Sequence, residues 1–173
     1  MPGPEKVISA TGHRFVQLPD QSQPESLHGA LEPILWRLAT DQLEIAQPSH
    51  LITGGTIGFS LVITEAARAL KIPYTLALPF KSYRKRWTDG PRDRLESLIE
   101  DAASVEYISS DGYSDYKMRR RDHWMIDHSD WVMALWSGRQ GGTANAIMYA
   151  WSRRKQVKNI WPEFVKQASE KTL

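Results

Sequence analysis

Three short segments of this 173-residue chain have the composition of ligand-binding turns. They are Thr11-Gly12-His13-Arg14, Thr53-Gly54-Gly55-Thr56-Ile57-Gly58 and the stretch from Gly138 to Thr143, and each follows a short apolar run. Glycine lets the backbone approach a ligand closely, and unpaired N–H groups at a helix start attract phosphate. These segments therefore favour binding of a phosphorylated ligand, although a glycine after a strand also serves as a plain turn. The predicted phosphate-binding residues are Thr11, Gly12, His13, Arg14, Gly54, Gly55, Thr56, Gly58, Gly141, Gly142 and Thr143.

Two further segments, 80–87 and 118–124, mix cations with aromatic rings. This mixture suits a nucleotide base with its phosphates, or single-stranded nucleic acid, and the alternative interpretation is a solvated basic surface. If both segments are loops above the same strand ends, they form a lid in which an arginine neutralises a diphosphate and an aromatic ring stacks. The predicted lid and stacking residues are Tyr83, Arg86, Trp87, Arg119, Arg120, Arg121, Trp124, Asp127 and Asp130.

Other kinds of chemistry lack their characteristic residues. His123 and Asp127 are four residues apart and would share a helical face, but no full ligand set accompanies them, so no metal site is predicted. The glycine turns lack the lysine of a nucleotide-hydrolysing P-loop, and the chain has no Gly-x-Ser-x-Gly elbow. Cysteine is absent, which excludes disulfides and thiolate catalysis.

The elements that must position these residues alternate between strand and helix. Apolar runs at 7–10, 51–53, 74–78, 105–108 and 131–136 predict strands, separated by segments with helical spacing. This alternation predicts an α/β, Rossmann-like three-layer sandwich with a central, mostly parallel sheet of five or six strands. Residues 1–173 are expected to form one domain, with a core over about 6–155, a C-terminal tail over 156–173 and an edge strand at 159–161. In such sheets ligands bind at the carboxyl ends of the strands, where the three turns lie.

Composition narrows the function further. The chain is 41% hydrophobic and 24% charged, with a net charge of +2, which excludes collagen, coiled coil and a disordered chain and gives no bulk signal for nucleic acid. No apolar stretch reaches the ~20 residues of a membrane span, and residues 1–6 lack a signal-peptide layout, so a cytoplasmic protein is expected. Trp131, Trp136 and Trp151 are interpreted as core packing or a homodimer contact.

The order of the motifs resembles a known family. Thr11-Gly12-His13-Arg14, Thr53-Gly54-Gly55 with Gly58, Leu78-Pro79-Phe80 with Trp87, Asp127-His128-Ser129-Asp130 and Gly141-Gly142-Thr143 occur in succession over about residues 7–152. This succession resembles the YpsA-like branch of the SLOG superfamily (SMF/DprA-LOG), which includes DprA and the LOG phosphoribohydrolases. The resemblance implies binding of a nucleotide or an ADP-ribose-like ligand, with phosphate against the residues Gly54, Gly55, Gly141, Gly142 and Thr143. No other cofactor is implied.

Two departures from the family pattern favour a binding protein, such as a sensor or accessory factor, over an enzyme. LOG-type enzymes carry a glutamate shortly after the last glycine turn, where this chain has Ala144-Asn145-Ala146. The second turn continues Gly58-Phe59-Ser60 in place of the Gly-x-Asp of YpsA-like proteins. Two alternatives stay open. One is an N-glycosidic-bond enzyme of the phosphoribohydrolase or deoxyribosyltransferase kind, with Glu65 or Asp130 as its carboxylate. The other is DprA-like binding of single-stranded DNA.

Overall fold

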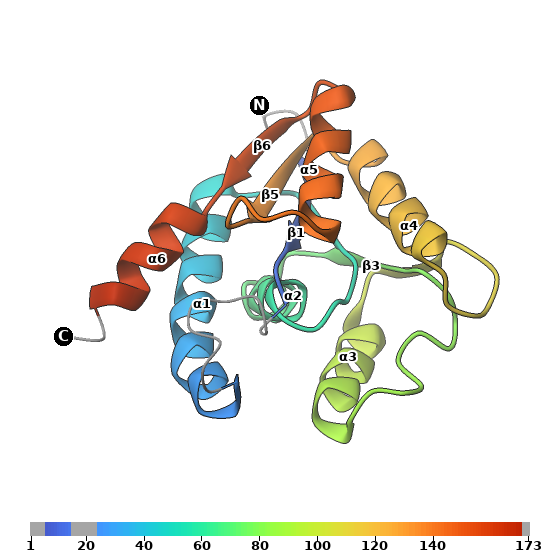
Figure 1. The fold of residues 1–173 in the computed structure, drawn as a ribbon, viewed down its shortest axis with the longest axis horizontal. Helices are drawn as coiled ribbons and strands as arrows, with labels where there is room; N and C mark the ends of the chain where they lie inside the picture. The colour runs from blue at the N-terminus through green and yellow to red at the C-terminus, as the bar shows by residue number, and fades with distance from the viewer. Residues whose placement is uncertain (1–5, 15–23, 171–173) are drawn as a thin grey trace.

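A computed structural model describes residues 6–14 and 24–170, and the side chains of the second segment from residue 31 onward. Strands and helices alternate through these residues (Figure 1). The strands are β1 (Val7–Gly12), β2 (His50–Thr53), β3 (Tyr74–Leu78), β4 (Ser104–Tyr107), β5 (Trp131–Leu135) and β6 (Gln156–Asn159). The helices are α1 (Pro24–Ala46), α2 (Phe59–Ala69), α3 (Asp89–Asp101), α4 (Asp115–Asp127), α5 (Gly142–Ser152) and α6 (Trp161–Glu170).

The six strands form one sheet in the order β4-β3-β2-β1-β5-β6, and every neighbouring pair is parallel. Strand β1 lies inside the sheet, with Ser9 opposite Ile52 of β2 on one side and opposite Val132 of β5 on the other. The chain moves outward from β1 to β4 and then returns, through α4, to the far side of β1. The strand order therefore reverses at β1, which makes the carboxyl end of β1 the expected ligand position.

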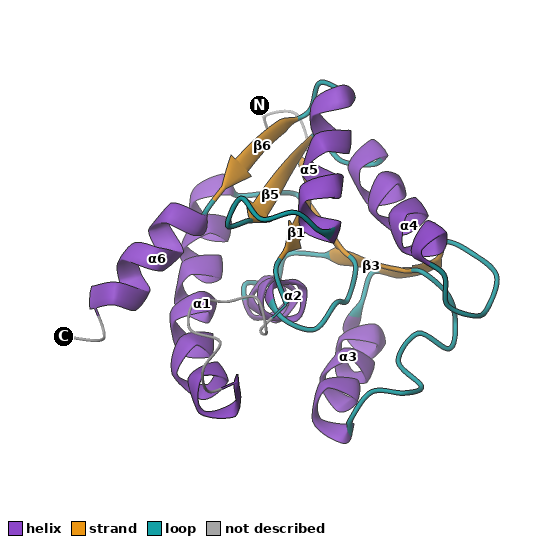
Figure 2. Cartoon of the chain, in the orientation of Figure 1, coloured by secondary structure: helices purple, strands orange, loops and turns teal. Residues whose placement is uncertain are grey.

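Helices cover both faces of the sheet, as the predicted sandwich requires (Figure 2). Helix α1 packs on α2 and α6, and α2 packs on α3, while α4 packs on α5 against the opposite face. Right-handed connections between parallel strands explain why the helices divide between the two faces. The connection from β4 to β5 runs back along the sheet, so its helix α4 lies on the face opposite to α1 and α2. The α1 face holds the larger core, which includes Leu35, Leu38 and Phe59, all fully buried. The α4–α5 face has smaller apolar clusters, one of them around Ile126 and Val132.

The structure confirms the predicted strands to within one or two residues and corrects two other segments. The edge strand predicted at 159–161 lies at Gln156–Asn159, because Ile160 and Phe164 turn into the core and carry α6 with them. The sheet and its packing therefore continue past residue 155, where the sequence pattern predicts the core to end. Segment 118–124, expected as a loop above the strand ends, lies inside α4.

The start of α4 is fixed by Ser114, whose side-chain oxygen accepts a hydrogen bond from the Lys117 N–H at 3.2 Å. Most positions of this helix hold polar residues, so the helical spacing of its apolar residues is hard to recognise in the sequence. Among the described residues, no helix combines the length and apolar character needed to cross a membrane.

Candidate functional site

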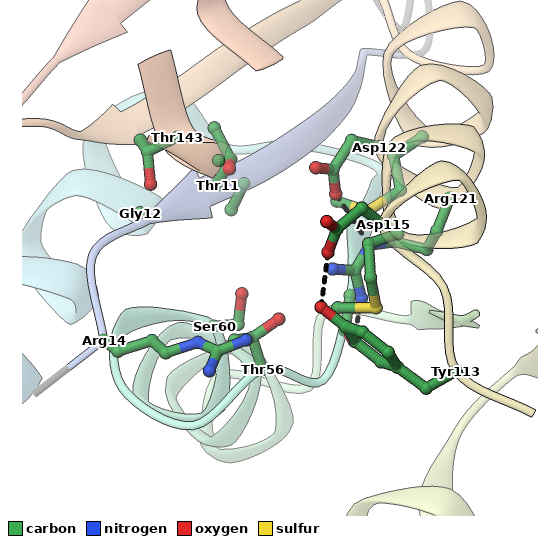
Figure 3. A pocket seen from close by; sticks show the side chains of 15 residues that line it. Thr11, Gly12, Arg14, Thr56, Ser60, Tyr113, Asp115, Arg121, Asp122 and Thr143 are labelled. Carbon is green, nitrogen blue, oxygen red and sulfur yellow. Dashed lines mark hydrogen bonds and ion pairs between the residues drawn. The ribbon is translucent and has the colours of Figure 1, made fainter. Parts of the chain in front are cut away.

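A cavity of about 390 Å³ lies at the carboxyl end of β1, where the strand order reverses (Figure 3). Segments from four parts of the chain line it: the end of β1, the turn into α2, helix α4 and the start of α5. Seven of the predicted phosphate-binding residues are among its lining residues, namely Thr11, Gly12, Arg14, Gly54, Thr56, Gly142 and Thr143. The fold thus brings together turns that are far apart in the sequence, as the parallel sheet predicts; Thr11 and Thr143 are 132 residues apart.

The end of β1 is packed tightly against β5 and α2. The His13 N–H donates to the Leu135 carbonyl at 3.1 Å, and the His13 carbonyl accepts from the Phe59 N–H at 3.2 Å. A Cβ atom on Gly12 would lie 2.5 Å from Cδ1 of Phe59, so only glycine fits between the strand and the first turn of α2. The end of β1 is therefore fixed to both β5 and α2.

Gly54 and Gly55 belong to the turn between β2 and α2, residues 54–58, which is also tightly packed and is called the closed turn below. Gly55 has a φ of +62°, a left-handed conformation that glycine adopts without strain, and a Cβ there would lie 2.9 Å from Cδ1 of Leu95. A Cβ on Gly54 would lie 2.6 Å from Nη1 of Arg121. Gly55 and Gly58 do not line the cavity, whereas Thr56 and Ser60 do. The glycines make room for the packing of this turn, and the hydroxyl residues Thr56 and Ser60 line the cavity together with Gly54.

Arg121 joins α4 to the closed turn. Its side chain is 5% exposed, its Nη1 donates to the Gly54 carbonyl at 2.7 Å, and its Nε donates to Oδ1 of Asp122 at 2.7 Å. Burial lowers the pKa of the guanidinium, but the Asp122 carboxylate and the hydrogen bonds with Asp122 and Tyr83 outweigh burial and hold the pKa above its ordinary value. A permanent positive charge is therefore buried in the wall of the cavity.

Helix α4 also supplies carboxylates that the predicted site does not include. Asp115, Met118, Asp122 and Met125 follow one another at helical spacing and all line the cavity. Oδ1 of Asp115 accepts a hydrogen bond from the Tyr113 hydroxyl at 2.5 Å, and this bond raises the pKa of Tyr113. The Ser114 cap and the spacing of these four residues are the sequence signals for this face of the helix. Carboxylates here can accept hydrogen bonds from sugar hydroxyls.

The turn on the β5 side of the cavity is open. Gly141 caps the start of α5, and its carbonyl accepts the Asn145 N–H at 3.0 Å. A Cβ on Gly142 would meet no atom within 4 Å, and Gly142 and Thr143 line the cavity. The first N–H groups of a helix have no acceptor within the helix and carry its positive dipole end. This turn can therefore present backbone donors to an anion.

A second cavity of about 760 Å³ adjoins the first and shares four lining residues with it: Arg14, Thr56, Tyr113 and Met118. The 80–87 segment forms much of its wall. The Tyr83 ring packs edge-on against Phe80 at 5.7 Å and Trp87 at 5.0 Å between ring centroids. Of the predicted lid residues, Tyr83, Arg86 and Trp87 line this cavity, and Arg121 lines the first.

Segment 110–112 closes one side of the second cavity. Oδ1 of Asp111 accepts hydrogen bonds from the Ser82 N–H at 2.9 Å and hydroxyl at 2.5 Å, which lower the pKa of Asp111. Lys117 Nζ donates to the carbonyls of Ser110, Asp111 and Gly112 at 2.8, 2.8 and 2.9 Å. The turn before α4 is thereby tied both to the 80–87 segment and to α4 itself.

Several predicted residues line neither cavity. His13 is buried, and its Nε2 accepts the Ser137 N–H at 2.8 Å, so this histidine tethers β1 to the segment after β5. Arg119 is exposed on α4, and Arg120 lies over the Tyr116 ring at 5.9 Å. Trp124 stacks on His128, with ring centroids 4.0 Å apart.

The remaining carboxylates lie elsewhere. Oδ2 of Asp130 accepts the Val7 N–H at 2.8 Å, at the amino end of β1, and Asp127 pairs with Arg153 at 3.1 Å. Glu65 pairs with Arg94 at 2.7 Å and lies outside both cavities. Among the side chains that the structure describes, in 6–14 and 31–170, no three metal-ligating groups gather into a cluster.

The sequence of this chain matches a known protein family. Residues 8–167 match the YpsA family model, which describes the YspA SLOG family. The prophage-derived protein YoqJ of Bacillus subtilis is 29% identical over 117 residues, which cover 58% of this chain and 68% of that protein. A UPF0398 protein of Bacillus thuringiensis is 23% identical over 170 residues, which cover 92% of this chain and 90% of that protein.

Solved structures share the fold. DNA processing protein A from Helicobacter pylori, described for its single-stranded DNA binding mode, has a TM-score of 0.64 at 14% identity, and the match covers 88% of this chain and 63% of that one. The molybdenum cofactor carrier protein of Chlamydomonas reinhardtii has a TM-score of 0.55 at 17% identity, over 88% of this chain and 74% of that one. At these identities the likeness concerns the fold alone.

Proposed function

This chain belongs to the YpsA family of SLOG proteins, and we propose that it binds a nucleotide or a nucleotide-derived ligand at the carboxyl ends of its strands, as a sensor or accessory protein. The observation that carries the proposal is the meeting of the two helix starts, α2 and α5, with Arg14 and the buried Arg121 around one cavity. Helix starts and guanidinium groups both favour phosphate, and here they surround one space.

The remaining lining residues suit the sugar of the same ligand. Thr11, Thr143, Thr56 and Ser60 lie across the cavity from Asp115 and Asp122 (Figure 3). Hydroxyl groups donate and accept hydrogen bonds, and ionised carboxylates accept them from ribose hydroxyls. The volume of about 390 Å³ lies within the usual range for small-molecule pockets. A nucleotide with its phosphate at the starts of α2 and α5 and its ribose toward α4 would therefore contact both the anion-binding residues and the carboxylates.

Isothermal titration with AMP and with adenosine tests the proposal, because these two ligands differ only in the phosphate. We expect AMP to bind and adenosine to bind much more weakly, and native mass spectrometry of protein purified without added ligand should show a bound nucleotide. Equal binding of the two ligands, or no binding of either, would contradict phosphate recognition at this cavity.

An N-glycosidic-bond enzyme is the second candidate, and Asp115 and Asp122 are the observation that favours it. Cleavage of a glycosidic bond uses a carboxylate to activate water or to stabilise the transition state. The two aspartates line the cavity, whereas Glu65 and Asp130 do not. Incubation with AMP, CMP and ADP-ribose, followed by chromatography for free base, separates this candidate from simple binding. Base release that is lost in Asp122→Asn would favour the enzyme.

Binding of single-stranded nucleic acid is the third candidate. Tyr113 and Tyr116 are 70% and 63% exposed, and Arg120 lies over the Tyr116 ring. Exposed rings beside cations suit stacked bases, as in proteins that bind single strands. A steep fall of oligonucleotide affinity with salt would favour this candidate over a small-molecule ligand.

A further inference from the structure

The two cavities adjoin each other and differ in chemistry. They share Arg14, Thr56, Tyr113 and Met118, so a ligand can extend from one into the other without crossing the core. The first cavity offers hydroxyls, carboxylates and helix starts. The second cavity is larger, at about 760 Å³ against about 390 Å³, and offers aromatic rings and cations. A single mononucleotide would leave much of this second space empty.

The second cavity carries excess positive charge. Lys85 and Arg86 are exposed and line it, and neither takes part in any ion pair found among the described residues. The one carboxylate in its wall, Asp111, already accepts two hydrogen bonds from Ser82. The cavity therefore favours an anionic group.

The same cavity also offers an aromatic wall. Tyr83 packs edge-on against both Phe80 and Trp87, and all three rings line the space. Flat heterocycles stack on such rings with little dependence on their identity. A ring that also carries negative charge matches this wall and the two cations together.

We infer that the second cavity takes a second nucleotide unit of the same ligand, so that the preferred ligand is a dinucleotide whose two halves are joined through phosphate. This inference rests on the proposed function, because the first unit occupies the first cavity. Arg14 lines both cavities and so stands at the junction, where the bridging phosphate lies. Tyr113 also borders both cavities, and its hydroxyl is held by Asp115 on the side of the first cavity.

Titration with three ligands tests the inference: AMP, the 3′–5′ linked dinucleotide pApA, and two adenosines joined 5′–5′ by a diphosphate. We expect at least one dinucleotide to bind on the order of tenfold more tightly than AMP, since one further base is stacked. The difference between the two dinucleotides identifies the linkage.

The double variant Lys85→Ser/Arg86→Ser tests the second cavity, and Lys81→Ser is the control, because Lys81 is exposed in the same segment but lines neither cavity. The double variant should remove the advantage of the dinucleotide and leave AMP affinity unchanged, while Lys81→Ser should change neither. If AMP binds and neither dinucleotide binds more tightly, or if the double variant weakens AMP equally, the inference is wrong and the proposed function stands. If none of the three binds, both are wrong.

Discussion

The two turns beside β1 have similar glycine-rich sequences but different surroundings. On the β2 side, added Cβ atoms at Gly54 and Gly55 would lie 2.6 Å and 2.9 Å from neighbouring side chains, and Arg121 covers the turn. On the β5 side, added Cβ atoms at Gly141 and Gly142 would meet nothing within 4 Å. One turn is part of the protein interior, and the other faces open space.

This difference separates two reasons for glycine that look the same in a sequence. In the closed turn, glycine makes room for packing, so substitution should cost folding free energy whatever the ligand. In the open turn, glycine leaves room beside the helix start, so substitution should affect binding and spare the fold. Measuring stability and affinity for the same variants tests whether the two turns differ in this way.

The largest effect is expected from Arg121→Met in the wall of the closed turn. The substitution removes one partner of a buried ion pair and leaves the Gly54 carbonyl without its hydrogen bond. The free energy of unfolding should fall by about 3 kcal/mol, measured by urea denaturation. Arg120→Met, on the exposed side of the same helix, is the control and should change it little. A loss below about 1 kcal/mol for Arg121→Met would contradict the role given to this side chain.

Gly12→Ala and Gly142→Ala compare the packed end of β1 with the open turn before α5, using the same added atom. The new Cβ at position 12 would lie 2.5 Å from Phe59 and 2.9 Å from Leu135, and overpacking of this kind typically costs about 1–3 kcal/mol. At position 142 the added methyl group meets no neighbour, so stability should change by less than about 0.5 kcal/mol. Thermal and urea unfolding of both variants measure the contrast. Equal losses would mean that the open turn is packed as well.

Gly142→Glu tests whether the open turn binds an anion. A carboxylate at the start of α5 occupies the position expected for phosphate and repels it, so AMP affinity should fall by about 2 kcal/mol, or about thirtyfold. Gly142→Ala is the matched control and should keep most of the affinity. Titration calorimetry at constant salt gives both values. Unchanged AMP affinity in folded Gly142→Glu would locate the phosphate elsewhere.

The smallest effect concerns Tyr113, at the rim that both cavities share. Its hydrogen bond to Asp115 raises the pKa of the phenol above its ordinary value of about 10, because ionisation removes the donated proton beside a carboxylate. Asp115→Asn should therefore shift the tyrosinate titration of this residue to lower pH. The difference in ultraviolet absorbance between each protein and its Tyr113→Phe counterpart isolates the signal. Because Tyr113 is 70% exposed, added salt should shrink the shift.

The fold was readable from the sequence because buried parallel strands are continuous apolar runs. Strand β3 is buried at all five positions, and nothing in 74–78 competes with that interpretation. Helix α4 was not readable in the same way, since only a few of its residues face the core and the rest are charged. The exposed strand β6 has the same difficulty, because its positions are mostly solvent-facing.

The candidate site was readable only in part. Turns at strand ends identify Thr11, Thr56 and Thr143, because topology alone brings strand ends together. Arg121 is buried and Asp122 lines the cavity because of how α4 packs on the sheet. The composition of the segment does not predict this packing. His13 is a different case: its place in a turn suggests chemistry, whereas its side chain is buried and lines neither cavity.

The central position of β1 has a consequence for how the protein folds. Ser9 of β1 and Ser129, just before β5, are 120 residues apart in the chain and hydrogen-bonded at 2.9 Å. Joining such distant segments is entropically costly and slow, whereas β1 to β4 can pair through shorter loops. The cavity between the two turns exists only after β5 has docked beside β1. A ligand at this junction should therefore slow unfolding and leave the folding rate almost unchanged, provided that β5 docks after the transition state.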